Sequence, residues 1–260
     1  MNQVIDVLLK RKSIRAYEPK EISADVKASL LQATLRAPTA GNLMLYTILD
    51  ITDQSLKDRL AKTCDDQPFI AKAPLLLLFL ADYQRWYDYF LASGVPTICA
   101  EKNEPMRTPA EGDLFLACCD ALIAAQNAVI AAEALGLGSC YIGDIMEHYE
   151  IHKEMFNLPQ YVFPISLLCI GYPTEQQNNR EQSTRFDEKF IVFENQYRRL
   201  AAPEFDQMFS LRHQQMFNGR DNLAGSVNVG QATYRRKFNA EFSIELNRSV
   251  RAILKEWTHP

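Results

Sequence analysis

The hydrophobic pattern is dominated by one long apolar stretch, which runs from Leu114 to Leu135 and is followed by Gly136-Leu-Gly138. Its four polar residues gather on one stripe of a helix, because they recur at seven-residue spacings (Asp120, Gln126, Asn127 and Glu133). The stretch is long enough to cross a bilayer, but an aspartate in the middle of a membrane helix costs roughly 2.5–3.5 kcal/mol. No second stretch resembles it. We therefore expect a buried core helix and no membrane association.

The segment after this helix predicts a strand that ends at a candidate ligand site. Gly136 suits the left-handed conformation that ends many helices. The apolar residues 139–143 then predict a short buried strand. Gly143 and Asp144 would lie at its end, where open α/β sheets tend to bind their ligands.

The rest of the pattern predicts alternating helices and strands. Ser23 is a plausible N-cap for a helix that reaches about residue 36, and Asp53 for a helix that reaches about residue 62. A run that is apolar on both faces, residues 73–81, is typical of a central covered strand. Further predicted elements are a helix over 4–9, strands over 45–51 and 162–171, helices over 83–91 and 147–156, and a long surface loop or lid over 93–112.

Composition narrows the class of protein. The chain has 260 residues, of which 47% are hydrophobic, and its net charge of −4 does not attract nucleic acid. Six cysteines without a CxxC motif, and no signal peptide at the start, favour free thiols and a cytoplasmic location. We expect residues 1–200 to form the core. Residues 201–260 would be a C-terminal extension that wraps the core or a partner subunit and is not an independent domain.

A cluster of cations near the N-terminus is unusual in an acidic protein. Arg11, Ser13 and Arg15 alternate, so in an extended segment their side chains point the same way. Two guanidinium groups and a hydroxyl on one side are typical of a phosphate site. The alternative is a solvated basic face. A second candidate is the loop 37–42, where Thr39 and Asn42 offer hydrogen bonds to a ligand or to the turn itself.

Common catalytic motifs are absent from the sequence. It has no GxSxG, Walker A, HExxH or GxGxxG motif before a helix. His148 and His152 have a spacing that suits a metal, but no third ligand is evident, so we expect a solvated pair and no metal site. A phosphate site on a large apolar core therefore favours a cofactor that brings its own chemistry.

Five segments, in this order, resemble the landmarks of the FMN-dependent nitroreductase family, and most closely its NADPH-dependent oxygen-insensitive nitroreductase and flavin reductase branch. They are Arg11–Arg15, Ala37–Asn42, Ala121–Asn127, Leu135–Gly143 and Ile170–Pro173. The resemblance covers residues 2 to 200 well and the tail loosely. It implies an α+β fold with a mixed sheet flanked by helices around the long central helix, and a homodimer with two FMN molecules at its interface.

The resemblance also implies roles for individual residues. Arg11, Ser13, Arg15 and Arg185 would hold the FMN phosphate, Thr39 and Asn42 would contact the flavin in the partner's site, and Gln67 would bond the polar edge of the ring. The backbone N–H groups near Gly143 and Asp144 would face flavin N5. Arg235, Arg236 and Lys237 are candidates for the 2′-phosphate of NADPH, with a solvated basic cluster as the equal alternative.

Three positions depart from the pattern of the family. Asp144 stands where close relatives often have a second glycine, and a carboxylate there would raise the cost of reducing the flavin. Met44 replaces a frequent glutamine. Ser183 stands where a lysine is usual, which makes the phosphate pocket less positive.

These observations predict an NAD(P)H-dependent oxidoreductase that reduces nitroaromatics, quinones or flavins by ping-pong hydride transfer through flavin N5, without a catalytic side chain. FMN is the expected cofactor and NADPH, or else NADH, the donor. Two alternatives stay open. One is a non-turnover flavin-binding or redox-sensing protein, and the other is a specialised member of the family that performs reductive dehalogenation or flavin breakdown.

Overall fold

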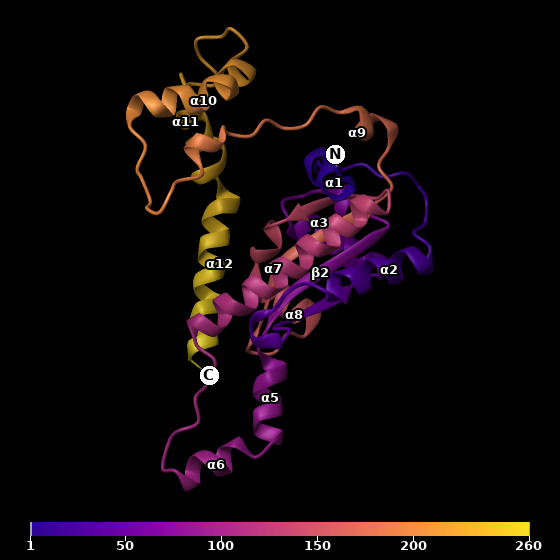
Figure 1. The fold of residues 1–260 in the computed structure, drawn as a ribbon, viewed down its shortest axis with the longest axis vertical. Coiled ribbons are helices and arrows are strands. Elements are labelled where there is room, and N and C mark those ends of the chain that lie inside the picture. The colour runs from indigo at the N-terminus through magenta and orange to yellow at the C-terminus, as the bar shows by residue number, and fades with distance from the viewer. Residues whose placement is uncertain (1, 260) are drawn as a thin grey trace. The chain divides into compact units, whose positions relative to one another are not determined.

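A four-stranded sheet with a long helix on one face forms the centre of the computed structural model, which describes residues 2–259 (Figure 1). The strands lie in the order β1 (Tyr46–Asp50), β2 (Leu75–Asp82), β4 (Val162–Gly171) and β3 (Gly138–Ile142), and the helix is α7 (Glu111–Ala134). This confirms the expected α+β class. The three strand pairs are all antiparallel, and the one parallel pairing among the described residues is an isolated bridge between Ser13 and Ser139.

Each face of the sheet has its own apolar layer. The alanines of α7 pack with Leu75, Leu77 and Phe79 on one face, where α2 (Ala24–Leu35) also contacts α7. On the other face, Leu76 and Leu78 pack with residues from α3 (Gln54–Thr63) and η2 (Asp144–Met146). All eight residues of β2 are buried, as its doubly apolar pattern predicts.

The two sides of α7 differ. Ten of its residues are buried, among them six alanines without exposed surface (Ala117, Ala121, Ala124, Ala125, Ala128 and Ala132). Large apolar side chains on the other side remain exposed in the single chain (Phe115, Leu116, Leu122 and Ile123). By length and composition α7 would pass as a membrane span, but it covers the sheet and supplies its core.

Most predicted elements are present with small shifts at their ends. Ser23 and Asp53 cap α2 and α3 by accepting hydrogen bonds from Val26 N and Leu56 N. The prediction of an unbroken loop over 93–112 is wrong, because α6 (Val95–Glu101) begins there with a proline in its first turn. The remaining helices of the first 180 residues are α1 (Gln3–Lys10), η1 (Ala40–Asn42), α4 (Pro68–Ala71), α5 (Gln84–Ala92), α8 (Tyr149–Phe156) and α9 (Glu175–Asn179).

The chain divides into two compact units. The first contains the residues up to 180 together with those from 245 onward, and the second contains residues 181–244. The second unit holds η3 (Glu188–Phe190), α10 (Ala202–Phe217), α11 (Val229–Thr233) and η4 (Tyr234–Phe238). Its aromatic contacts include Phe186 with Phe209, whose ring centroids lie 5.0 Å apart. Most of the last helix, from residue 245 onward, belongs to the first unit.

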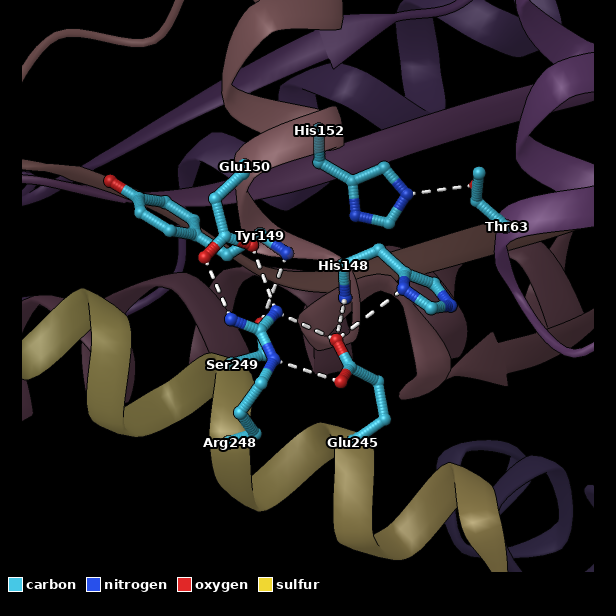
Figure 2. A network of polar contacts seen from close by, with 8 residues as sticks. All are labelled: Thr63, His148, Tyr149, Glu150, His152, Glu245, Arg248 and Ser249. Carbon is cyan, nitrogen blue, oxygen red and sulfur yellow. Dashed lines mark hydrogen bonds and ion pairs between the residues drawn. The ribbon is translucent and has the colours of Figure 1, made fainter.

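That last helix, α12 (Glu241–Thr258), is fixed to the start of α8 by a polar network (Figure 2). Arg248 donates to both carboxylate oxygens of Glu150, at 2.7 and 2.8 Å, and also to Glu245. Glu245 accepts from the backbone of His148, and Ser249 from that of Tyr149. Farther along α12, Trp257 is 1% exposed and donates to Ala110 O. The end of the chain is therefore part of the core.

Candidate functional site

The predicted phosphate segment lies along the free edge of β3. Ile14 N donates to Ser139 O at 2.8 Å, and Ser13 forms the parallel bridge with Ser139. Ile14 is buried, whereas Ser13 is half-buried and Arg15 is exposed. The predicted alternation therefore holds, with the apolar residue directed into the core and its polar neighbours directed away from it.

A glycine permits this close approach. A Cβ atom built on Gly138 would lie 2.4 Å from Cγ1 of Ile14, so any larger residue would push the segment away from β3. Gly138 is thus required by contact distance rather than by its backbone angles. The start of β3 and residues 13–15 are therefore packed directly against each other.

Additional cations gather at this end of β3. Arg180 donates to Ser13 O, and Lys12 donates to the carbonyl oxygens of Asn178 and Arg180 at 2.6 and 2.5 Å. Burial raises the pKa of the Cys140 thiol, while Arg15, Arg11 and Arg180 oppose that shift. Three guanidinium groups therefore act on one point of β3. Arg180 was not predicted from the sequence.

Two buried polar groups at the same end lack a protein partner among the described residues. They are Ser139 Oγ and Glu133 Oε1. Burial raises the pKa of Glu133 to about 7, against the opposing effect of Arg11 and Lys12. The buried Ser139 hydroxyl lies beside Ser13 and several cations. A phosphate group would accept hydrogen bonds from this set of donors.

The other end of β3 is acidic. After Ile142 the chain turns at Gly143 into η2, and Gln67 Nε2 donates to Asp144 Oδ2 at 2.8 Å. The same amide nitrogen donates to Cys64 O at 2.8 Å. Glu147 is 3% exposed and lies against Asp144. The structure therefore brings Gln67, Gly143 and Asp144 together at one strand end, with Glu147 beside them.

The loop that holds Thr39 and Asn42 lies before β1, at the opposite edge of the sheet from β3. Its shape is set by Asp120, which is 2% exposed and accepts hydrogen bonds from Thr39 Oγ1, Ala40 N (2.9 Å) and Leu45 N (3.0 Å). Asn42 is exposed, with a φ of +58°. Within one chain, this loop and the phosphate segment therefore lie apart.

Four of the predicted residues belong to the second unit. Arg185 donates to the carbonyl oxygens of Ser183 and Thr184 at 3.1 and 3.3 Å. Arg235, Arg236 and Lys237 are exposed on the single π-helical turn η4. Within that unit, Arg235 donates to Ala224 O at 3.2 Å, and the ammonium of Lys237 lies 5.2 Å from the ring centre of Phe242.

The expectation of a solvated histidine pair is wrong for His152. Its side chain has no exposed surface, and its Nε2 lies 2.8 Å from Thr63 Oγ1 (Figure 2). Burial lowers its pKa to about 4, so it is neutral at physiological pH. No group of three or more possible ligands for a metal ion occurs within residues 2–259.

Together these features describe an α+β protein with a candidate site for a phosphate-bearing ligand along an edge strand. From Gly138 to Ile142, β3 extends over roughly 13 Å at its usual rise per residue. Cations and unpaired donors lie at its start, and backbone amides with hydrogen-bonding side chains lie at its end. These residues fit FMN, whose phosphate and ring lie at opposite ends of an extended molecule.

The chain belongs to the nitroreductase family, whose model matches residues 8–172. It is 30% identical over 200 residues to the NADPH-flavin oxidoreductase of Vibrio harveyi, with 77% of each chain covered. It is 28% identical over 228 residues to the FMN reductase (NADPH) of Bacillus subtilis, covering 85% of this chain and 87% of the relative. Nitroreductase A of Vibrio parahaemolyticus has a similar fold, with a TM-score of 0.78, 25% identity, and coverage of 97% of this chain and 98% of that one. The resemblance seen in the sequence is therefore confirmed.

Sequence reasoning missed three residues of this site: Asp120, Arg180 and Glu147. A signal for Asp120 was present, since a lone aspartate in an apolar helix requires buried donors. No comparable signal marks Arg180 or Glu147, whose importance depends on how distant segments meet.

Proposed function

We propose that this protein is an FMN-dependent NAD(P)H oxidoreductase that reduces nitroaromatics, quinones or flavins. The observation that carries the proposal is the edge of β3, which has a cationic phosphate site at one end and the Gln67–Asp144 pair at the other. The relatives named NADPH-flavin oxidoreductase and FMN reductase (NADPH) support it.

The residues of the chain supply binding and orientation. When bound, FMN supplies the chemistry, by accepting and then returning a hydride at N5. Arg11, Ser13 and Arg15 hold the phosphate at the start of β3, and Gly143 and Asp144 present backbone N–H groups at its end. The hydride donor and the acceptor would bind in turn at the same exposed face of the flavin. No side chain then has to act as an acid or a base.

We further propose a homodimer in which α7 packs against its copy. The exposed apolar side of α7 is a continuous stripe, since Phe115, Leu122 and their neighbours recur at helical spacing. The position of Thr39 and Asn42 supports this arrangement, because they lie across the sheet from β3 and would complete the site of the partner. Leu122→Asp should therefore give monomers in analytical ultracentrifugation. Leu35→Asp, at an exposed leucine outside the stripe, is the control.

For the donor, we propose that Arg235, Arg236 and Lys237 bind the 2′-phosphate of NADPH. Their exposure on one short turn supports this role. Arg235→Ala/Arg236→Ala should raise the KM for NADPH and leave that for NADH unchanged, whereas Arg220→Ala in the same unit should change neither. Equal effects on both donors would contradict the assignment. A cytoplasmic location is proposed from the free cysteines.

The test of the proposed function is an absorbance spectrum of the purified protein, repeated after NADPH is added without oxygen. A yellow protein that bleaches, and regains its colour with menadione or nitrofurazone, would support FMN, the donor and both half-reactions. Protein that stays yellow with both NADPH and NADH would favour the non-turnover alternative, which the acidic end of β3 supports. Colourless protein that cannot be reconstituted with FMN would contradict the site.

A further inference from the structure

Glu147 is a buried carboxyl group that the proposed reaction does not use. It follows η2 directly, is 3% exposed, and its Oε1 has no hydrogen-bond partner among the described residues. An isolated ionised carboxylate is costly to bury, so such a group keeps its charge only beside a compensating cation.

The charged groups that act on the Glu147 carboxyl are acids. Asp144 and Asp65 lie closest, and Glu245 approaches from α12. The guanidinium of Arg59, on α3, acts on the neighbouring His152, and that of Arg248, on α12, is bonded to Glu150 and Glu245 (Figure 2). The titratable or charged groups around Glu147 are Cys64 and Asp65 after α3, Asp144 in η2, His148 and His152 at α8, and Glu245 and Arg248 on α12.

These neighbours make Asp144 the acceptor for a proton on Glu147. The Asp144 side chain already accepts from Gln67 Nε2, which marks it as a hydrogen-bond acceptor, and the Glu147 carboxyl lies within hydrogen-bonding range of it. Two carboxyl groups in such contact share one proton, because both cannot be ionised cheaply.

We propose that Glu147 is a positioning residue that remains protonated at neutral pH and holds Asp144 at the end of β3 through a carboxyl–carboxylate hydrogen bond. The pair then carries one negative charge beside the ring of FMN at neutral pH and two charges at alkaline pH. The location beside FMN rests on the proposed function, whereas the protonation of Glu147 does not.

The pH range of the change follows from the environment. Burial, followed by the charges of Asp144 and Asp65, raises the pKa of Glu147 to about 8. His152 stays neutral in this range because burial lowers its pKa to about 4, and burial raises the pKa of the Cys64 thiol well above its ordinary value. His148 is the residue next to Glu147 in the chain and carries an imidazole, so it requires a control.

Infrared difference spectroscopy of the FMN-free protein tests the proton directly. The wild type should show a protonated-carboxyl band at pH 7 that disappears as the pH passes about 8. Glu147→Gln should lack this band while keeping a donor to Asp144, and His148→Asn, which suits the left-handed conformation at that position, should retain it. Glu133 also has a raised pKa, so the measured quantity is the wild-type spectrum minus that of Glu147→Gln. Identical spectra would overturn the proposal.

The second measurement addresses the cofactor. In the FMN-loaded protein, the midpoint potential of the wild type should fall more steeply above pH 8 than that of Glu147→Gln, because only the wild type gains a charge. Parallel potentials would overturn the placement of this charge beside FMN. If neither protein binds FMN, the proposed function fails, and the infrared result still decides the protonation of Glu147.

Discussion

The two ends of the five-residue strand β3 have opposite electrostatic character. Around the first half of the strand, Arg11, Arg15 and Arg180 act on Cys140, and one buried acid, Glu133, is the exception. Beyond Ile142 the neighbours are Asp144, Glu147 and Asp65. A ligand laid along this strand would therefore have a cationic environment for its anionic group and an acidic one at its other end. The comparison indicates that the charge distribution along one strand favours one orientation of an extended anionic ligand.

The largest expected effect comes from removing the cations. Arg11→Ala/Arg15→Ala should weaken FMN binding about hundredfold, since each hydrogen bond to a charged group contributes roughly 1.5–3 kcal/mol. The binding is measured by quenching of FMN fluorescence. Lys20→Ala, an exposed cation that lies over the ring of Tyr172, is the control and should bind as the wild type does. Retained affinity in the double variant would show that the phosphate lies elsewhere.

A second prediction compares the two ends of β3 by adding a methyl group at each. Gly138→Ala should lower the free energy of unfolding by roughly 2 kcal/mol, the usual scale for overpacking. Gly143→Ala is the matched control at the other end of the same strand, because its Cβ would meet only Met146 Cε at 4.0 Å. Denaturant unfolding of the FMN-free variants gives both values. Equal losses would contradict the close packing of residues 13–15 on β3.

The third prediction concerns pH and stability. The pKa of Glu147 is raised to about 8 in the folded chain from an ordinary value of 4.5. The stability it contributes is therefore fully present below about pH 4.5 and is lost as the pH rises through about 8. Glu147→Gln escapes this loss and should exceed the wild type by about 1–2 kcal/mol at pH 9 relative to their difference at pH 5. Denaturant unfolding at the two pH values checks it, and a pH-independent difference would contradict it.

The smallest expected effect concerns the ion pairs of Arg248, which join α12 to α8. Arg248→Met should lower the melting temperature slightly at pH 7, because it removes the ion pairs with Glu150 and Glu245. The hydrogen bond from Arg248 holds the pKa of Glu150 at about 2, so the stability it contributes is present above pH 4.5 and lost toward pH 2. The difference between variant and wild type should therefore shrink below pH 4.5. A constant difference across this range would mean that packing, rather than charge, is responsible.

The sequence predicted those parts of the fold that depend on local pattern. The central helix, the doubly buried β2, and the caps at Ser23 and Asp53 each follow from spacing within one segment. The helix α6 was missed because its prolines and mixed charges suggest a loop, although a proline in the first turn is compatible with a helix. The burial of His152 was missed because the polar spacing of α8 gives no indication that Thr63 and η2 would cover it.

The candidate site was predictable where its residues share one segment or one family motif. The alternation at 11–15 anticipated the edge of β3, and the proximity of Gln67 to Asp144 agrees with their expected placement at one site. The roles of these residues toward FMN remain predictions. Arg180 and Glu147 were not predictable, because each acts through a contact between segments more than 60 residues apart or through burial that only the folded chain defines.

Asp120 gives α7 a further role. It fastens the loop 39–45 to the same helix whose opposite side would meet a second copy of the chain. Dimerisation would then also complete the FMN site, so the fraction of sites that hold FMN should rise with the concentration of subunits. Dilution would therefore lower the activity of this enzyme by favouring monomers. Bound FMN would in return stabilise the dimer.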